Sequence, residues 1–90
     1  MKYELAFDKE AIKQLKNIKA AKLTRQLDEL LGIISLDPYQ TPPPYKVLIG
    51  DKKGVVSRRI NKKHRLTYLV DESNKLIKII SLWSHYENFK

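Results

Sequence analysis

The sequence contains no cysteine and no long apolar run, and each absence excludes a class of structure. Without cysteine the chain can form neither disulfide bridges nor thiolate metal sites, which suits a reducing compartment. No segment approaches the roughly 20 apolar residues that a membrane-spanning helix needs. The opening MKYELAFDKEAIKQ lacks the apolar core of a signal peptide. We therefore expect a cytoplasmic protein with one domain over residues 1–90.

Acidic residues are also scarce, because 10 Asp and Glu face 18 Lys and Arg, a net charge of +8. Such an excess predicts an acidic partner: a nucleic acid, a membrane surface or an acidic protein. Part of the positive charge decorates the expected helices, where solvation explains most of it. These cations are Lys9, Lys13, Lys16, Lys19, Lys22 and Arg25.

The apolar pattern of the first 36 residues predicts a strand and two helices. Residues 3–7 alternate as a strand does, and Asp8 then offers an N-cap. A first helix follows, with a core stripe of Ala11, Ile12, Leu15 and Ile18. A second helix is expected from about 20 to 36. Its stripe consists of Leu23, Leu27, Leu30, Leu31 and Ile34.

The remaining residues predict a proline-rich loop followed by four strands. The loop DPYQTPPPY spans 37–45, and the strands are expected at about 45–50, 55–60, 65–71 and 75–84. The segment LIKIISLW, residues 76–83, is almost continuously apolar, which is typical of a central strand covered on both faces. The order β-α-α-β-β-β-β predicts an α+β fold, with a two-helix hairpin on a small, mostly antiparallel sheet.

The stretch SRRINKKHR, residues 57–65, concentrates six cationic side chains at one hairpin. It fits a solvated loop, a nucleic-acid footprint or part of an active site. Placing Ile60 on the same face as Leu66 requires Ile60 to pair with His64. That register sets Arg59 directly opposite Arg65, a repulsive arrangement that favours an anion between them.

The same register puts Ser57, Arg59, Arg65 and Thr67 on the opposite face, as a polar, cationic surface. The other cations of the hairpin are expected to form an electrostatic surround, with the two lysines at 62 and 63 in a solvated turn. His64 shares the face of Leu66 and is interpreted as structural.

The C-terminal WSHYENFK supplies a second candidate for chemistry. His85 and Tyr86 follow the end of an expected core strand, beside the cationic hairpin. Histidine gives and takes protons near neutral pH, so this pair favours a catalytic function.

Three segments, SRRINKKHRLTY, LWSHYE and the preceding DPYQTPPPYK, resemble the YoeB/Txe branch of the RelE superfamily of bacterial toxins. The resemblance implies a fold similar to microbial ribonucleases. It implies a toxin of a type II toxin–antitoxin module that cuts messenger RNA in the ribosomal A site. The implied partners are an acidic, YefM-like antitoxin, the ribosome with its mRNA, and a second copy of the chain. The implied reaction needs neither a metal nor a cofactor.

The resemblance also implies roles for individual residues. Arg65 resembles the transition-state clamp and Arg59 a second phosphate contact, with Lys52 and Lys53 as further phosphate-binding groups. His85 resembles the general acid, and Tyr86 a group that stacks on or positions the nucleotide.

One position departs from the family, because Lys46 stands where a glutamate base is usual. An unperturbed lysine titrates near pH ~10.4 and is a poor base, unless like charges nearby make it release its proton more readily. Lys46 is therefore either the base or a phosphate contact in a weakened or inactive toxin that still binds antitoxin and RNA.

Two other classes compete with this interpretation. If the chain were a ParE-like protein acting on DNA gyrase, His85 and the paired arginines would have no function. A simple nucleic-acid-binding protein is not supported by any recognition-helix, RNP or zinc-finger signature.

Overall fold

The computed structural model describes residues 2–48 and 54–83. Within them the chain forms two helices and five strands, which confirms the predicted order and the α+β class. The elements are β1 (Glu4–Phe7), α1 (Lys9–Ala20), α2 (Thr24–Leu36), β2 (Tyr45–Val47), β3 (Val56–Arg59), β4 (Arg65–Asp71) and β5 (Leu76–Ser81). Among the described helices none is long and apolar enough to cross a membrane.

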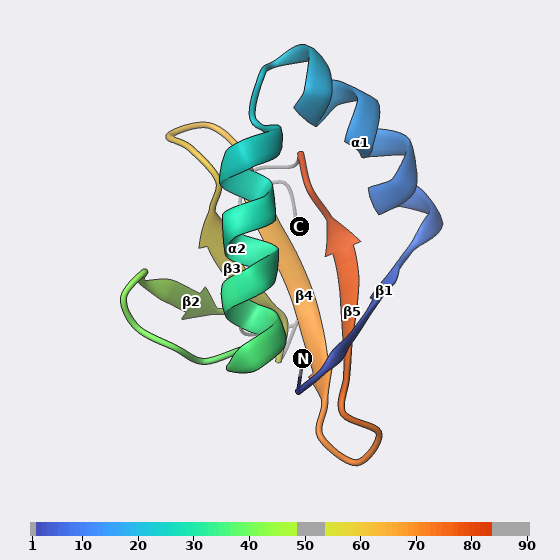
Figure 1. Ribbon diagram of the computed structural model, residues 1–90, viewed down its shortest axis with the longest axis vertical. Helices are drawn as coiled ribbons and strands as arrows, with labels where there is room; N and C mark the ends of the chain where they lie inside the picture. The colour runs from blue at the N-terminus through green and yellow to red at the C-terminus, as the bar shows by residue number, and fades with distance from the viewer. Residues whose placement is uncertain (1, 49–53, 84–90) are drawn as a thin grey trace.

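The five described strands form one sheet in the order β1-β5-β4-β3-β2. Strands β2 to β5 are antiparallel to their sequence neighbours, whereas β1 runs parallel to β5. The first strand of the chain therefore lies beside the last one (Figure 1).

Both helices pack on one face of the sheet, and Figure 1 shows α2 lying across it. The core between the layers is made of helix residues that face inward and of alternate strand residues. Fully buried members include Ala11, Leu27 and Ile34 from the helices and Val56, Leu66, Tyr68, Ile77 and Ile79 from the strands. Neither helix covers the opposite face of the sheet.

The inward face of α1 differs from the predicted stripe. Ala11 and Ile18 are buried as expected, but Ile12 and Leu15 are 56% and 40% exposed, and Gln14 is buried instead. The reason is a polar anchor: Gln14 Oε1 accepts hydrogen bonds from the backbone N–H groups of Leu82 (2.7 Å) and Trp83 (3.1 Å). Turning Gln14 inward rotates the two apolar neighbours toward solvent.

The break between the helices falls later than predicted. The first helix runs on to Ala20, and α2 begins at Thr24 rather than near residue 20. Lys22 lies between them with a φ of 60°, in the left-handed region, which turns the chain. Asp8 does occupy the N-cap position of α1, although its side chain makes no capping hydrogen bond.

Four of the five strands are shorter than predicted, whereas β4 spans the predicted residues 65–71, and both helices cover the same face of β5. It lies between β1 and β4, but Lys78 on its outer face is exposed while Ile77 and Ile79 are fully buried. The predicted helical cover on both faces is therefore wrong for the described residues, because both helices occupy the same side. Parts of two predicted strands, residues 49–50 and 84, lie outside the described residues.

Candidate active site

Three adjacent strands bring the candidate side chains to the face that the helices leave open. Lys46 of β2 pairs with Ser57 of β3, which pairs with Thr67 of β4. Arg59 lies two residues beyond Ser57 and directly opposite Arg65, so the predicted register is confirmed. Because strand side chains alternate, all five residues belong to one face of the sheet.

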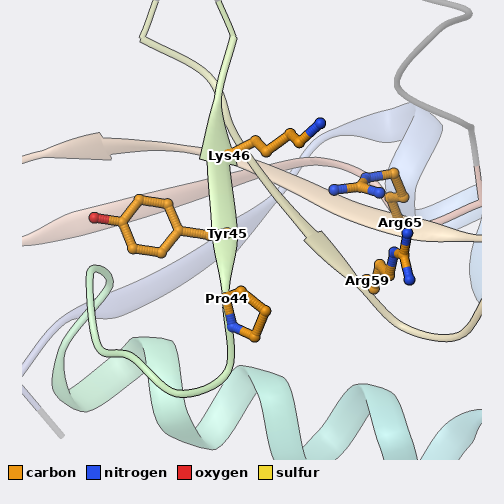
Figure 2. A pocket seen from close by; sticks show the side chains of 5 residues that line it. All are labelled: Pro44, Tyr45, Lys46, Arg59 and Arg65. Atoms are coloured by element: carbon orange, nitrogen blue, oxygen red, sulfur yellow. The ribbon is translucent and has the colours of Figure 1, made fainter.

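Lys46, Arg59 and Arg65 line one pocket of about 280 Å³, together with Pro44 and Tyr45. Figure 2 shows the Lys46 side chain extending from β2 toward Arg65, with Arg59 on the same side of the strand and the Tyr45 ring on the other. Among the described lining residues the charged groups are all positive. Such a cluster of guanidinium and ammonium groups matches a phosphate.

The floor beneath the arginines is polar and buried. Arg65 Nε donates a hydrogen bond to Ser57 Oγ at 2.6 Å, which fixes the orientation of the guanidinium. Ser57 and Thr67 are themselves fully buried, so they are not the surface groups that the sequence predicted. Thr67 Oγ1 is hydrogen-bonded to Ser81 Oγ at 2.7 Å.

A β-bulge makes that last contact possible. Between Thr67 and Tyr68 the register of β4 with β5 shifts, so that Thr67 pairs with Ser81 and Tyr68 with Ile79. The shift carries Ser81 to the polar face, although Ile79, two residues earlier, faces the core. The bulge thus extends a rigid polar floor from β3 to β5.

Four predicted site residues, Lys52, Lys53, His85 and Tyr86, lie outside the described residues. Beyond β5, the described part of the chain ends at Trp83. Its backbone oxygen is 2.7 Å from His64 Nδ1, and the two rings stack with centroids 3.6 Å apart. His64 therefore has the structural function predicted for it.

Arg58 was expected in the electrostatic surround of the site, and this expectation is wrong. Its side chain is fully buried on the helix-covered face of the sheet. The Nε atom donates to Tyr68 Oη, and the two terminal nitrogens donate to the carbonyl oxygens of Pro38, Gln40 and Pro43. Strand alternation alone would have found its orientation, since its neighbour Arg59 was already assigned to the open face.

The described residues contain no group of three or more His, Cys, Asp or Glu side chains that could hold a metal ion. What the described part of the site offers is positive charge on a rigid sheet, suited to binding and stabilising an anionic phosphate.

Comparison with solved structures defines a class of bacterial toxins for this fold. A YoeB/ParE toxin from Agrobacterium tumefaciens superimposes with a TM-score of 0.83 at 24% identity, covering 92% of this chain and 99% of that one. The YoeB dimer from Staphylococcus aureus superimposes with a TM-score of 0.81 at 30% identity, covering 96% and 100%.

The sequence comparisons give the particular family. Residues 7–86 match the profile of the YoeB-like toxin of bacterial type II toxin-antitoxin systems. A Toxin YoeB from Synechocystis is 35% identical over 66 residues, which cover 73% of this chain and 74% of that relative. The chain belongs to the YoeB family of toxins.

Proposed function

We propose that this YoeB-family toxin is an endoribonuclease that cuts messenger RNA in the ribosomal A site and so inhibits translation. The observation that carries the proposal is the pocket lined by Lys46, Arg59 and Arg65 from three neighbouring strands. Arg59 and Arg65 lie opposite each other, and this repulsive pair is relieved when a phosphate binds between them.

The proposed reaction is an attack by the ribose 2′-oxygen on the adjacent phosphorus. A base removes the 2′-hydroxyl proton, the bond from phosphorus to the 5′-oxygen breaks, and an acid protonates the departing 5′-oxygen. The products are a 2′,3′-cyclic phosphate and a free 5′-hydroxyl. The negative charge that develops on the phosphoryl oxygens needs fixed cations nearby.

Arg65 is suited to that stabilising role, because its guanidinium is held by Ser57 at 2.6 Å and lines the pocket. Arg59 would contact the same phosphate from the opposite strand, with Lys52 and Lys53 as further contacts. His85 would be the general acid, and Tyr86 would stack on or position the nucleotide. The assignments of these last four residues rest on the family resemblance.

For Lys46 we propose a phosphate contact rather than the function of the base. It lines the pocket as a third positive group in place of the usual family carboxylate. The protein would then bind RNA well but cleave it slowly. This observation favours a second candidate function: a weakened or inactive toxin that keeps antitoxin and ribosome binding.

We further propose an acidic, YefM-like antitoxin as the partner that covers the Arg59 and Arg65 face, and a homodimer of the free toxin. Two observations on a relative support this proposal. The Staphylococcus aureus YoeB that is 30% identical to this chain forms a dimer, and it also forms a complex with YefM.

The activity is tested by adding the toxin to a defined mRNA with and without translating ribosomes and mapping the cuts by primer extension. We expect cuts that require ribosomes and that are lost in Arg65→Ala. Equal cutting of naked RNA would contradict ribosome dependence. Intact RNA under every condition, with inhibited translation, would support the binding-only candidate.

The function of Lys46 is tested with Lys46→Glu and Lys46→Ala in the same assay. A carboxylate at this position restores the usual base of the family, so we expect Lys46→Glu to cleave faster than the native chain. The expected gain is on the order of 10²-fold, as for an added proton-transfer group. A fully active native protein that both substitutions inactivate would instead make Lys46 the working base.

A further inference from the structure

Arg58 holds the loop between α2 and β2 against the sheet. Its guanidinium donates to three backbone carbonyl oxygens of this loop, those of Pro38 (3.1 Å), Gln40 (2.8 Å) and Pro43 (2.6 Å). These acceptors span most of the connection from Leu36 to Tyr45. One side chain of β3 therefore fixes a loop that follows a helix more than 20 positions earlier in the sequence.

Two tyrosines complete the arrangement. Tyr68 Oη accepts from Arg58 Nε at 2.9 Å and donates to the Pro38 oxygen at 2.7 Å. Tyr45 of β2 is the strand-pairing partner of Arg58, and the centroid of its ring lies 4.9 Å from the guanidinium carbon. We call Arg58, Tyr68 and Tyr45, with the three carbonyl groups, the Arg58 clamp.

All four hydrogen-bond partners of Arg58 in the described structure are neutral. Burying a guanidinium without a carboxylate is costly, and an apolar side chain of similar volume would fill the core with less desolvation. What the arginine adds is geometry, because its planar fork fixes several carbonyl oxygens at once.

That geometry bears directly on Lys46. Strand β2 has only three residues, pairs with β3 and lies at the edge of the sheet, so few ladder hydrogen bonds hold it. Lys46 is the middle residue, and Tyr45 beside it is part of the Arg58 clamp. Because adjacent strand residues point to opposite faces, fixing Tyr45 on the inner face aims Lys46 into the pocket on the outer face.

We propose that Arg58 is a positioning residue for Lys46: the Arg58 clamp on the inner face fixes the position of the Lys46 side chain in the pocket on the outer face. The role assigned to Lys46 rests on the proposed function, whereas the effect of Arg58 on β2 does not. Arg59 and Arg65 lie on β3 and β4, which pair with strands on both sides, and do not depend on the clamp.

The first test measures local order without RNA. Amide hydrogen exchange is compared in the native protein, Arg58→Lys and Tyr68→Phe; the last variant keeps the ring and removes only one hydroxyl. We expect exchange at β2 amides to accelerate by more than the loss of global unfolding free energy explains, and exchange in β4 and β5 to accelerate by no more than that loss. Uniformly faster exchange throughout the sheet would overturn the proposal, since Arg58 would then only stabilise the whole fold.

The second test asks whether the effect runs through Lys46. The probe is a fluorescein-labelled single-stranded RNA with 2′-O-methyl sugars, which cannot be cleaved because the 2′-oxygen is blocked, and the readout is its affinity by fluorescence anisotropy. In the native background we expect Arg58→Lys to weaken binding by roughly threefold to tenfold. Tyr68→Phe should weaken binding by less, because it removes only one hydroxyl group.

The Arg58 and Tyr68 substitutions are then repeated in two variant proteins, Lys46→Ala and Arg59→Ala, to form double-mutant cycles. In Lys46→Ala the same substitutions should cause no further loss, whereas in Arg59→Ala, the matched control, they should cause the full loss again. Equal losses in both backgrounds would overturn the positioning role. Absence of RNA binding by the native protein would count against the proposed function, and the exchange experiment would still decide the inference about Arg58.

Discussion

Arg58 and Arg59 are consecutive residues of one strand, yet they belong to opposite regions of the molecule. Arg58 is fully buried under the helices and meets carbonyl oxygens and a tyrosine hydroxyl. Arg59 is exposed, lines the pocket and faces another arginine across the hairpin. Arg58 is satisfied by the protein itself, whereas Arg59 lines the pocket that we propose to bind phosphate.

The difference teaches that charge in a sequence window says little about function until each side chain is assigned to a face. On the inner face a cation must find partners within the chain, because leaving it unpaired is costly. On the outer face repulsion between cations is tolerated, since it is relieved by an anion. The following predictions test this contrast, from the largest expected effect to the smallest.

The two histidines should differ as the two arginines do: His85 should matter for catalysis and His64 for stability. If His85 is the general acid, His85→Ala should lose on the order of 10²–10⁴ in the cleavage rate on translating ribosomes. The melting temperature should hardly change. A variant that melts early and keeps its full specific activity would make His85 structural.

His64→Ala provides the matched control for that experiment. It removes the ring that stacks on Trp83 and its contact with the Trp83 oxygen, so it should lower the melting temperature and keep most of the cleavage rate. Calorimetry and primer extension on the same preparations separate the two outcomes.

The two arginines should differ most in the free energy of unfolding. Arg58→Met removes four hydrogen bonds and leaves the carbonyl oxygens of Gln40 and Pro43 without this donor, so it should cost at least about 3 kcal/mol. Arg59→Met should stay within about 0.5 kcal/mol of the native protein or stabilise it, because a like-charge pair is removed. Urea unfolding measures both, and equal losses would contradict the contrast.

In the proposed antitoxin complex, Arg65 should affect the association rate more than the dissociation rate. A positive group on the open face attracts an acidic partner, so Arg65→Ala should slow association several-fold to about tenfold at low salt. The difference should shrink at high salt, where charges are screened. Lys16→Ala, on the outside of α1, is the control, and stopped-flow fluorescence gives the rates. Unchanged rate and affinity at both salt concentrations would place the antitoxin elsewhere.

The smallest expected effect is a pH dependence on the inner face. Burial raises the pKa of Tyr68, although the hydrogen bond and charge of Arg58 act in the opposite direction. A pKa that is higher in the folded state means that the folded protein holds this proton more tightly. The contribution to stability is therefore complete below the unfolded value near pH ~10 and is lost as the pH rises through the folded pKa.

Tyr68→Phe should remove this contribution. The unfolding free energies of the two proteins, compared from neutral to alkaline pH, should converge above about pH 10. A difference that stays constant over the whole range would show that the hydroxyl does not titrate with folding.

Much of the fold and part of the site could be predicted from the sequence, for reasons visible in particular residues. Alternation along the hairpin set Ile60 against His64, and the opposition of Arg59 and Arg65 followed from that pairing. Apolar spacing in α2 identified Leu27, Leu30 and Ile34 as buried. These are local patterns of period 2 or 3.6, which the backbone imposes.

The errors concern side chains whose partners lie far away in the sequence. Gln14 turns inward because backbone N–H groups 68 and 69 positions later need an acceptor. Arg58 is buried because carbonyl oxygens of a proline-rich loop surround it. Ser81 faces Thr67 because of a bulge. No periodicity records such contacts, since they depend on tertiary packing.

The parallel pairing of β1 with β5 has a consequence for the synthesis of the protein. Glu4 pairs with Leu76, and Gln14 bonds to the backbone of Leu82 and Trp83, so the N-terminal strand and helix meet their partners only when the last strand exists. A nascent chain emerges from its N-terminus first, and β1 must therefore wait for nearly the whole chain to leave the exit tunnel. We therefore expect the N-terminal strand and helix to stay undocked, and the sheet incomplete, until β5 has left the exit tunnel.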